Sequence, residues 1–528
     1  MKLFKAALLA AALTMPMGAG AAFADTPANM LVVAQNIDDI VAIDPAQAYE
    51  FTSGELVTNT YDRLVQYDAE DPTVLSAGLA SEWTADDEAK TITFTMRDDA
   101  TFSSGNPVRA EDVAFSLGRV IKLNLTPAFI LAQLGWTPEN VDDMVSVDGD
   151  TVTIKYDGDF SSAFVLNVLA SRPASIVDEK EVMAHETDGD MGNAWLNSNT
   201  AGSGPFSLAD YRPAELIRLT ANPDYFKGAP AMESVIIRHV AESATQQLLL
   251  TSGDVDLARN LTPDQIASIE GDGIKVETFP QAAVHFLSFN QKTEALQPEA
   301  VWEAARYLVN YEGMTDSFLK GQMEIHQAFW PKGFPGSYDE TPFTYDPEKA
   351  KQILADAGVE TPIDVTLDVI NSAPFTDMAQ SLQASFAEAG INFDIIPGTG
   401  AQVITKYRDR THEAMLLYWG PDFMDPHSNA KAFAYNSDNS DDNYQATTTW
   451  RNAWAVPDDM NKETMAALSE SDPDKRLEMY VDLQKKVQET SPIIIMFQAA
   501  YEVAMQDDVD GYVNGATSDF VYYRLVTK

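Results

Sequence analysis

The chain has 528 residues, of which 45% are hydrophobic, and its formal charge at pH 7 is −45. This length exceeds what one hydrophobic core supports and predicts two or three domains. The acidic balance excludes nucleic acid and anionic membrane surfaces as partners, because proteins bind both through basic patches.

The first 24 residues have the parts of a secretory signal peptide. Lys2 and Lys5 precede an apolar run, and residues 22–24 form an A-x-A cleavage pattern. The alternative is a membrane anchor, which needs about 20 apolar residues and a longer run than this one. We expect cleavage near Ala24 and a soluble mature chain in the periplasm. Because the sequence has no cysteine, no disulfide or lipid-bearing cysteine holds the chain, and large cores must stabilise it.

Strand and helix signals alternate along the mature chain. Residues 91–102 alternate as a strand does, and the apolar spacing of residues 109–123 predicts a helix. Further signals follow in chain order: a strand at 152–156, a helix at 346–358, and helix–strand pairs within 378–397 and 475–497. The helix at 346–358 has Asp346 as its N-cap, Pro347 as its first residue and Gly358 as its stop. The alternation predicts α/β domains.

Short motifs of common enzyme classes are absent from the sequence. There is no G-x-S-x-G, no G-x-x-x-x-G-K-[ST] and no G-x-G-x-x-G. His412-Glu413 begins like the zinc motif H-E-x-x-H, but Leu416 stands where the second histidine belongs. Asp422 and Asp425 are an alternative acid/base pair, yet nothing nearby in the sequence would raise a pKa. We therefore predict a binding protein and not an enzyme.

Several stretches, in a fixed order over roughly 500 residues, resemble one family of exported receptors. They lie at residues 43–68, 79–120, 202–230, 252–258, 286–290, 345–358 and 419–426. In the third stretch, residues 202–206 (GSGPF) are expected to use glycines at a sharp backbone turn. From about residue 30 onward the chain resembles the extracytoplasmic solute-binding proteins of ABC importers, in the family of dipeptide-, oligopeptide- and nickel-binding proteins (family 5).

The resemblance implies an α/β, bilobed fold of the periplasmic-binding-protein type (type II) with an extra N-terminal domain. Lobe I would comprise residues 25–70, 200–290 and 500–528, the extra domain residues 71–199, and lobe II residues 291–499. Strand-like segments at 284–290 and 493–504 suit the two crossings between the lobes. Such proteins close on their ligand like a hinge, which excludes water and strengthens each polar contact.

The resemblance also implies a role for the segment YWGPDFMDP. In peptide-binding members the acid of a W-x-x-D pattern receives the α-ammonium group of the ligand. Here that acid is Asp422, and Trp419 would be a wall of the pocket. The alternative is that Asp422 caps a following turn and that Trp419 belongs to the core. Asp425, which precedes Pro426, is expected to start a turn.

Aromatic residues are plentiful near the expected cleft, and their faces suit apolar side chains, sugar rings and cations. The candidates for ligand contact are Tyr49, Phe51, Tyr444, Trp450 and Trp454. For each of them, packing in a core or loop is the alternative.

The sequence departs from the pattern of dipeptide-binding relatives at one position. Those relatives carry an arginine for the peptide's carboxylate shortly after the strand that precedes residue 378, and none is present here. Arg408, Arg410 and Arg451 are the nearest candidates in sequence to stand in for it. The resemblance therefore leaves the ligand open between a dipeptide, a longer peptide, an amine without a carboxylate and a sugar-like solute.

The predicted function is that of a periplasmic receptor that captures a dipeptide or oligopeptide by hinge closure and delivers it to an inner-membrane ABC permease. The alternative is a receptor of the same fold for a sugar, an opine-like amine or a metal chelate. His427 lies near two acids, but a single histidine in such a loop is expected to be solvated, so we predict neither a metal site nor a cofactor. The chain is expected to be a monomer.

Overall fold

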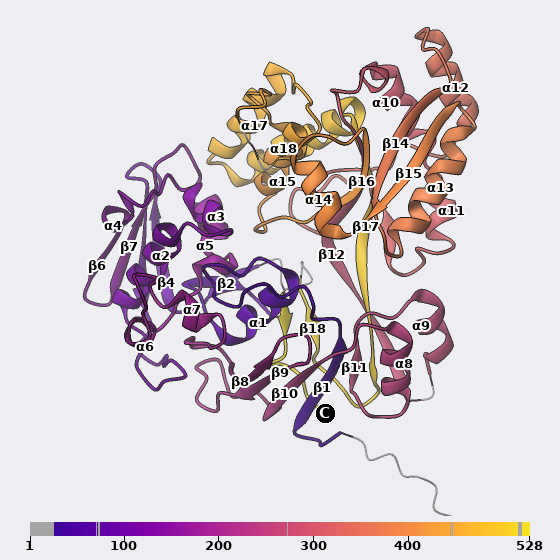
Figure 1. Cartoon of the computed structure of the whole chain (residues 1–528). Helices are drawn as coiled ribbons and strands as arrows, with labels where there is room; N and C mark the ends of the chain where they lie inside the picture. The colour runs from indigo at the N-terminus through magenta and orange to yellow at the C-terminus, as the bar shows by residue number, and fades with distance from the viewer. Residues whose placement is uncertain are drawn as a thin grey trace, which may run out of the picture.

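The computed structural model describes residues 26–69, 71, 74–271, 273–443, 445, 447–515 and 520–528, and only the backbone of residue 401. Two bodies lie one above the other in Figure 1, and a third, formed by N-terminal segments, lies beside the lower one. The upper and lower bodies are connected by β12 (Ile274–Phe289) and β17 (Ile493–Gln506). The expected signal peptide, residues 1–24, lies outside the described residues. In the described part of the chain, no helix is both long and apolar enough to cross a bilayer.

One mixed sheet runs through the upper and lower bodies and has eleven strands among the described residues. At its centre β12 and β17 pair antiparallel, with register shifts between Pro280 and Val284 and between His285 and Phe286. On the upper side the sheet continues through β16 (Ala414–Trp419), β14 (Ile363–Ile370) and β15 (Ile391–Gly398). On the lower side it continues through β11 (Leu257–Ala258), β1 (Met30–Gln35), β10 (Ser234–His239), β9 (Leu216–Ala221) and β8 (Phe206–Arg212), and β13 (Met323–Ile325) pairs with β17.

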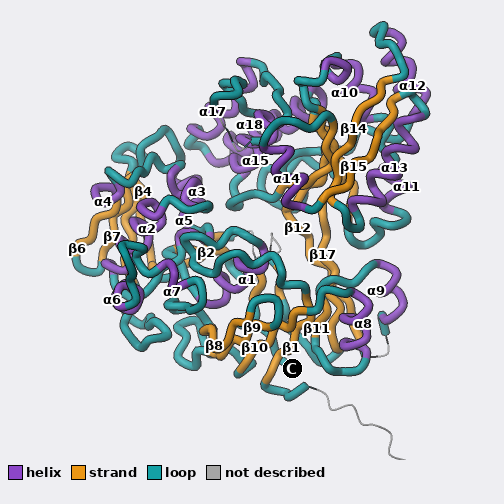
Figure 2. The backbone as a smooth tube through the Cα atoms, in the orientation of Figure 1, coloured by secondary structure: helices purple, strands orange, loops and turns teal. Residues whose placement is uncertain are grey.

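Helices cover this sheet in both bodies. In the lower body they are α1 (Phe51–Thr60), α8 (Ser243–Thr251) and α9 (Pro263–Ile269). In the upper body they are α10 (Glu299–Arg306), α11 (Tyr311–Thr315), α12 (Pro347–Asp356), α13 (Phe375–Ala387), α14 (Gly400–Arg408), α15 (Pro426–Ala434), α16 (Thr448–Arg451), α17 (Asp458–Ser469) and α18 (Pro473–Thr490). Figure 2 shows α12 and α13 on one side of β14 and β15, and α15, α17 and α18 grouped on the other.

The third body is built on a separate antiparallel sheet. Its strands, in spatial order, are β4 (Ala80–Asp86), β5 (Thr91–Met96), β7 (Thr151–Lys155) and β6 (Val145–Asp148). Around it lie α2 (Ala110–Leu123), α3 (Ala128–Ala132), α4 (Val141–Met144), α5 (Ser162–Leu169), α6 (Glu179–Ala184) and α7 (Asn193–Leu196). Two short ladders complete the chain: β2 (Val65–Tyr67) with β3 (Leu75–Ala77), and β18 (Val513–Asn514) with β19 (Val521–Tyr522).

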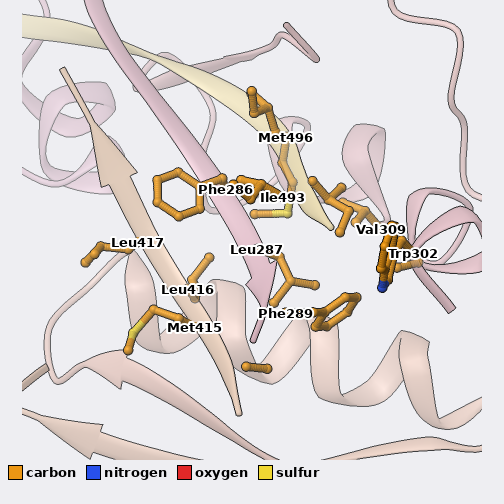
Figure 3. Packing of buried hydrophobic residues seen from close by; sticks show 14 of the residues in the cluster. Phe286, Leu287, Phe289, Trp302, Val309, Met415, Leu416, Leu417, Ile493 and Met496 are labelled. Atoms are coloured by element: carbon orange, nitrogen blue, oxygen red, sulfur yellow. The ribbon is translucent and has the colours of Figure 1, made fainter. Parts of the chain in front are cut away.

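Each body has its own apolar core. In the upper body, side chains of β12, β16 and β17 pack against Trp302 and Val309, as Figure 3 shows. A second core surrounds β5, β7 and α2 of the third body. That second core includes Phe423, which comes from the loop after β16 and is 2% exposed. The loop after β16 therefore inserts into the third body, although its strand belongs to the upper one.

The structure confirms the predicted α/β class and several predicted elements. The predicted helices at 109–123 and 346–358 are α2 and α12, and the carboxylate of Asp346 accepts the backbone N–H of Lys349 as an N-cap. The strand predicted at 91–102 is shorter, because β5 ends at Met96. The division into lobes near residues 200, 290 and 500 stays a proposal, since β12 and β17 belong to one continuous sheet across both bodies.

Candidate functional site

The candidate site lies where β16 leaves the core of the upper body. Residues 414–417 of this strand are buried, and Tyr418 and Trp419 at its end are half-buried. Trp419 is opposite Val284 of β12 in the antiparallel ladder. A short loop then leads to α15, whose N-cap is Asp425, with Pro426 as its first residue. The apolar strand therefore brings its last aromatic residues and the following acids to the edge of the core.

Asp422 is in this loop, and its carboxylate faces another part of the chain. The hydroxyl of Tyr49 donates to Asp422 Oδ1 at 2.9 Å across 373 residues of sequence. The backbone N–H of Asp422 donates to the hydroxyl of Ser428 at 3.0 Å. The cap of α15 is supplied by Asp425, whose carboxylate accepts the backbone N–H of His427 at 2.9 Å. The turn-capping alternative for Asp422 is therefore wrong, and Asp425, which was expected to start a turn, is instead the N-cap of helix α15.

The surroundings of Asp422 act on its charge in opposite directions. Burial raises the pKa of Asp422, and the hydrogen bond from Tyr49 lowers it in part. The cationic side chains of Arg172, Arg451 and Lys431 lower that pKa further. Burial and the neighbouring carboxylate together raise the pKa of the Tyr49 hydroxyl well above its ordinary value. At neutral pH Tyr49 therefore remains a donor.

Aromatic side chains line the same region. The ring of Tyr49 meets Phe129 edge to face, with centroids 6.0 Å apart. Trp419 meets Phe433 of the core at 6.2 Å, and its buried indole Nε1–H has no hydrogen-bond partner among the described residues. Trp419 thus packs on the core through Phe433 and, being half-buried, remains partly exposed beside the candidate site. Its role as a pocket wall stays a prediction.

Phe51 lies at the start of α1, two residues after Tyr49, and is 39% exposed. It lines a cavity of about 280 Å³ in the lower body. The other lining residues are Gln35, Asn36, Asp38, Asp39, Thr52, Glu55, Arg259, Asn260 and Tyr501. The structure therefore places Phe51 at an open surface beside the segment that meets Asp422. Contact with a ligand stays a prediction for Phe51 too.

The remaining aromatic candidates lie inside the protein or outside the described residues. Trp450 is 3% exposed, its indole N–H donates to the carbonyl of Ser440 at 3.0 Å, and the guanidinium of Arg410 stacks over its ring. Trp454 is 5% exposed and belongs to the core of the upper body. Both therefore have the packing role that was the alternative, and a ligand role stays a prediction. Tyr444 lies outside the described residues.

Two features of the site have little or no signal in the sequence. Lys431 and Arg172 act on Asp422 from α15 and from the third body, and no motif or spacing connects them to it. His427, expected to be solvated, is 2% exposed, and its Nδ1 lies 3.0 Å from the hydroxyl of Tyr480. That expectation is wrong because α15 packs on α18 and encloses the ring. Among the described residues, no group of three or more His, Asp and Glu side chains is placed to hold a metal ion.

Comparisons with known proteins agree with the resemblance. The sequence model described as "Bacterial extracellular solute-binding proteins, family 5 Middle" matches residues 74–441. The probable D,D-dipeptide-binding periplasmic protein DdpA of Escherichia coli K12 is 28% identical over 499 residues, which cover 93% of each chain. The Helicobacter pylori binding protein DppA, solved with the peptide STSA, superposes with a TM-score of 0.79 at 22% identity and covers 94% of this chain and 98% of its own. NikZ of Campylobacter jejuni, solved with Ni(L-His), superposes with a TM-score of 0.78 at 18% identity. The superposition covers 95% of this chain and 100% of the NikZ chain. These last two likenesses show the bilobed fold alone.

Proposed function

Since the chain belongs to the family 5 bacterial extracellular solute-binding proteins, we propose that it is a periplasmic receptor that captures a peptide between its lobes and delivers it to an ABC permease. The name of the Escherichia coli relative DdpA, a probable D,D-dipeptide-binding protein, supports a peptide rather than another solute. The family consists of binding receptors, which supports a role without catalysis.

The observation that carries the proposal is the hydrogen bond between Tyr49 and Asp422. It joins the segment before α1 to the loop after β16, so it lies between the lower and upper bodies. The second carboxylate oxygen, Oδ2, has no hydrogen-bond partner among the described residues. We propose that this oxygen receives the α-ammonium group of the peptide.

The energetics of Asp422 support coupling between capture and closure. A charge-assisted hydrogen bond to an ammonium group stabilises by about 1.5–3 kcal/mol. A carboxylate that is enclosed without a cationic partner loses hydration at a large cost. Lobes that close around Asp422 are therefore more stable with an amine bound than without one. In this proposal the lobes are residues 25–70, 200–290 and 500–528 on one side and 291–499 on the other.

The cellular setting of the proposal follows from the relatives and the N-terminus. The relatives are periplasmic proteins. We propose that the signal peptide is cleaved near Ala24 and that the mature chain works as a monomer. Delivery of the peptide then requires an inner-membrane permease that recognises the closed form.

Native mass spectrometry of the mature protein, mixed with an enzymatic casein hydrolysate, tests the proposal. The wild-type protein should retain short peptides from the untreated hydrolysate and lose them when the same hydrolysate is N-acetylated. The substitution Asp422→Asn should weaken retention tenfold or more, because it removes the charge that pairs with the amine. Asp394→Asn, which changes an exposed carboxylate on β15, is the matched control and should bind as the wild type does. Retention of acetylated and free peptides to the same extent would refute the amine anchor.

A further inference from the structure

The strongest unexplained feature of the site is a buried arginine without a counter-ion. Arg451 is the last residue of α16 and is 8% exposed. Its backbone is fixed, because the hydroxyl of Thr447 caps the helix and the Thr447 carbonyl accepts the N–H of Arg451 at 3.1 Å. The guanidinium carbon lies 5.4 Å from the ring of Tyr407 and 5.7 Å from that of Trp419. The side chain is thus held between two aromatic rings, one of which belongs to the end of β16.

Three buried arginines of the chain have buried carboxylate partners, whereas Arg63, Arg306 and Arg451 form no ion pair among the described residues. Arg119 pairs with Asp44, Arg259 with Glu55, and Arg476 with Asp425, in each case with both partners buried. Among the described residues, no carboxylate forms an ion pair with Arg451, and its buried Nε–H has no hydrogen-bond partner. Aromatic faces offset only part of the hydration that a buried cation loses. An anion that meets Arg451 at the candidate site would supply the countercharge that the two rings lack.

A second cation points to the same conclusion. Lys431 lies in α15, is half-buried and forms no ion pair among the described residues. Burial lowers its pKa, and the charge of Asp422 opposes that shift. Arg451 and Lys431 both favour the charged form of Asp422, so one carboxylate faces two cations that form no ion pair among the described residues. A ligand with an amine alone would add to this excess of positive charge.

We infer that Arg451, supported by Lys431, binds a carboxylate of the captured solute, which is therefore a zwitterion with both an amine and a carboxylate. This inference rests on the proposed function and names its ligand class. A guanidinium matches a carboxylate with two parallel hydrogen bonds, which an ammonium or an amide does not reproduce. Dipeptide-binding relatives bind the peptide carboxylate with an arginine that follows the strand corresponding to β14, and this chain has none there. In the inferred site Arg451 binds the carboxylate instead. It comes from a different element, the short helix that follows the loop after α15.

The position of the two groups limits the length of the solute. Arg451 stacks on Trp419, and Asp422 follows Trp419 by three residues in the same loop. An extended peptide adds about 3.5 Å with each residue. An amine on Asp422 and a carboxylate on Arg451 therefore favour a dipeptide over peptides of five or more residues.

The test compares two forms of one probe on the full mature protein. One portion of the casein hydrolysate is left untreated, and another is methyl-esterified, which removes the carboxylates and keeps the amines. Native mass spectrometry reports what each portion leaves on the protein. The wild-type protein should retain mainly dipeptides from the untreated portion and at least tenfold less from the esterified one.

Esterified peptides could be retained less because they have lost the charge that pairs with Arg451 or because the methyl group does not fit. Variants of Arg451 distinguish these two explanations. Arg451→Gln should reduce retention of the free acids about tenfold and retain acids and esters equally. Lys431→Met should reduce the preference for acids to a smaller extent. Arg408→Gln is the matched control, because Arg408 is an exposed arginine at the end of α14, and it should keep the wild-type preference.

Each outcome bears on a different claim. If the wild type retains esters as well as acids, the inference is wrong and the peptide receptor stands. If Arg451→Gln keeps the preference for acids, the carboxylate does not bind to Arg451. If neither portion leaves a peptide on the wild type, the proposed function itself fails. The comparison of acid and ester on the wild type needs no variant, so an Arg451 variant that does not fold leaves the inference testable.

Discussion

Asp422 keeps an ionisable carboxylate in a half-buried position because several neighbours replace part of its hydration. The hydroxyl of Tyr49 donates to it, and three cationic side chains favour its charged form. Burial acts more strongly than these neighbours, so the pKa of Asp422 is raised. The residue is therefore ready to pair with a cation, and protons compete with that cation at a higher pH than for an exposed aspartate.

This balance predicts how the binding of amine ligands depends on pH. The proposed anchor binds an ammonium group only as a carboxylate, so protonation of Asp422 weakens binding. Because the pKa of Asp422 is raised, affinity should fall on acidification at a higher pH than the range where exposed carboxyls titrate. Calorimetric titration of a retained dipeptide between pH 7.5 and 4.5 measures this decline.

Two variants show whether the decline belongs to Asp422. Asp422→Asn should bind weakly and with little dependence on pH over the same range. Asp394→Asn should keep the wild-type slope. A wild-type affinity that first falls in the range where exposed carboxyls titrate would contradict the raised pKa.

Individual elements were predictable where a local pattern defines them. The helix at 346–358 has its cap, its proline and its glycine within thirteen residues of sequence, and α12 forms there. Asp422 and Trp419 could be named as candidates because they belong to one short segment. The contacts that complete the site join segments far apart in the chain, such as Tyr49 with Asp422, and leave no periodic signal. The burial of His427 was missed for the same reason, since α18 encloses it.

The glycines of residues 202–206 have a different role from the one the sequence indicates. A sharp turn was expected, but neither Gly202 nor Gly204 has a positive φ. Both lie against the C-terminal end of α1. A Cβ on Gly202 would lie 2.1 Å from the carbonyl oxygen of Thr60, and one on Gly204 would lie 2.5 Å from the carbonyl carbon of the same residue. Glycine is required there because two backbones approach each other closely.

The substitution Gly202→Ala should therefore destabilise the protein. The new methyl group meets backbone atoms of α1, which cannot move as a side-chain end does, and overpacking of this kind costs about 1–3 kcal/mol or more. Thermal unfolding of the mature protein measures the loss of stability.

Gly400→Ala is the matched control, because a Cβ at that first position of α14 meets no atom within 4 Å. It should leave the melting temperature unchanged or raise it slightly. Equal melting temperatures for both variants would contradict the close approach.

At the scale of the whole molecule, the loop after β16 connects all three bodies. Its strand belongs to the upper body, and Asp422 meets Tyr49, which precedes α1 of the lower body. Phe423 packs edge to face on Phe164 of the third body, with ring centroids 5.5 Å apart. The backbone N–H of the next residue, Met424, donates to the hydroxyl of Tyr67 at 2.9 Å. The proposed hinge motion must break these contacts when the molecule opens.

Phe423 should therefore favour the closed form without touching the ligand. Truncation of a buried phenylalanine destabilises the conformation that buries it by about 3–5 kcal/mol. The closed form buries Phe423 and should lose this stability, whereas the open form, in which the contact is already broken, should lose less. Phe423→Ala should then shift the ligand-free protein toward the open form and weaken peptide binding about tenfold or more, because less of the protein is ready to bind. Small-angle scattering should give a larger radius of gyration for the ligand-free variant, and saturating peptide should restore the wild-type value. Phe386→Ala, in the core of the upper body alone, should lower the melting temperature and leave the radius of gyration unchanged. A Phe423→Ala protein with the wild-type radius in both states would show that this contact has no part in closure.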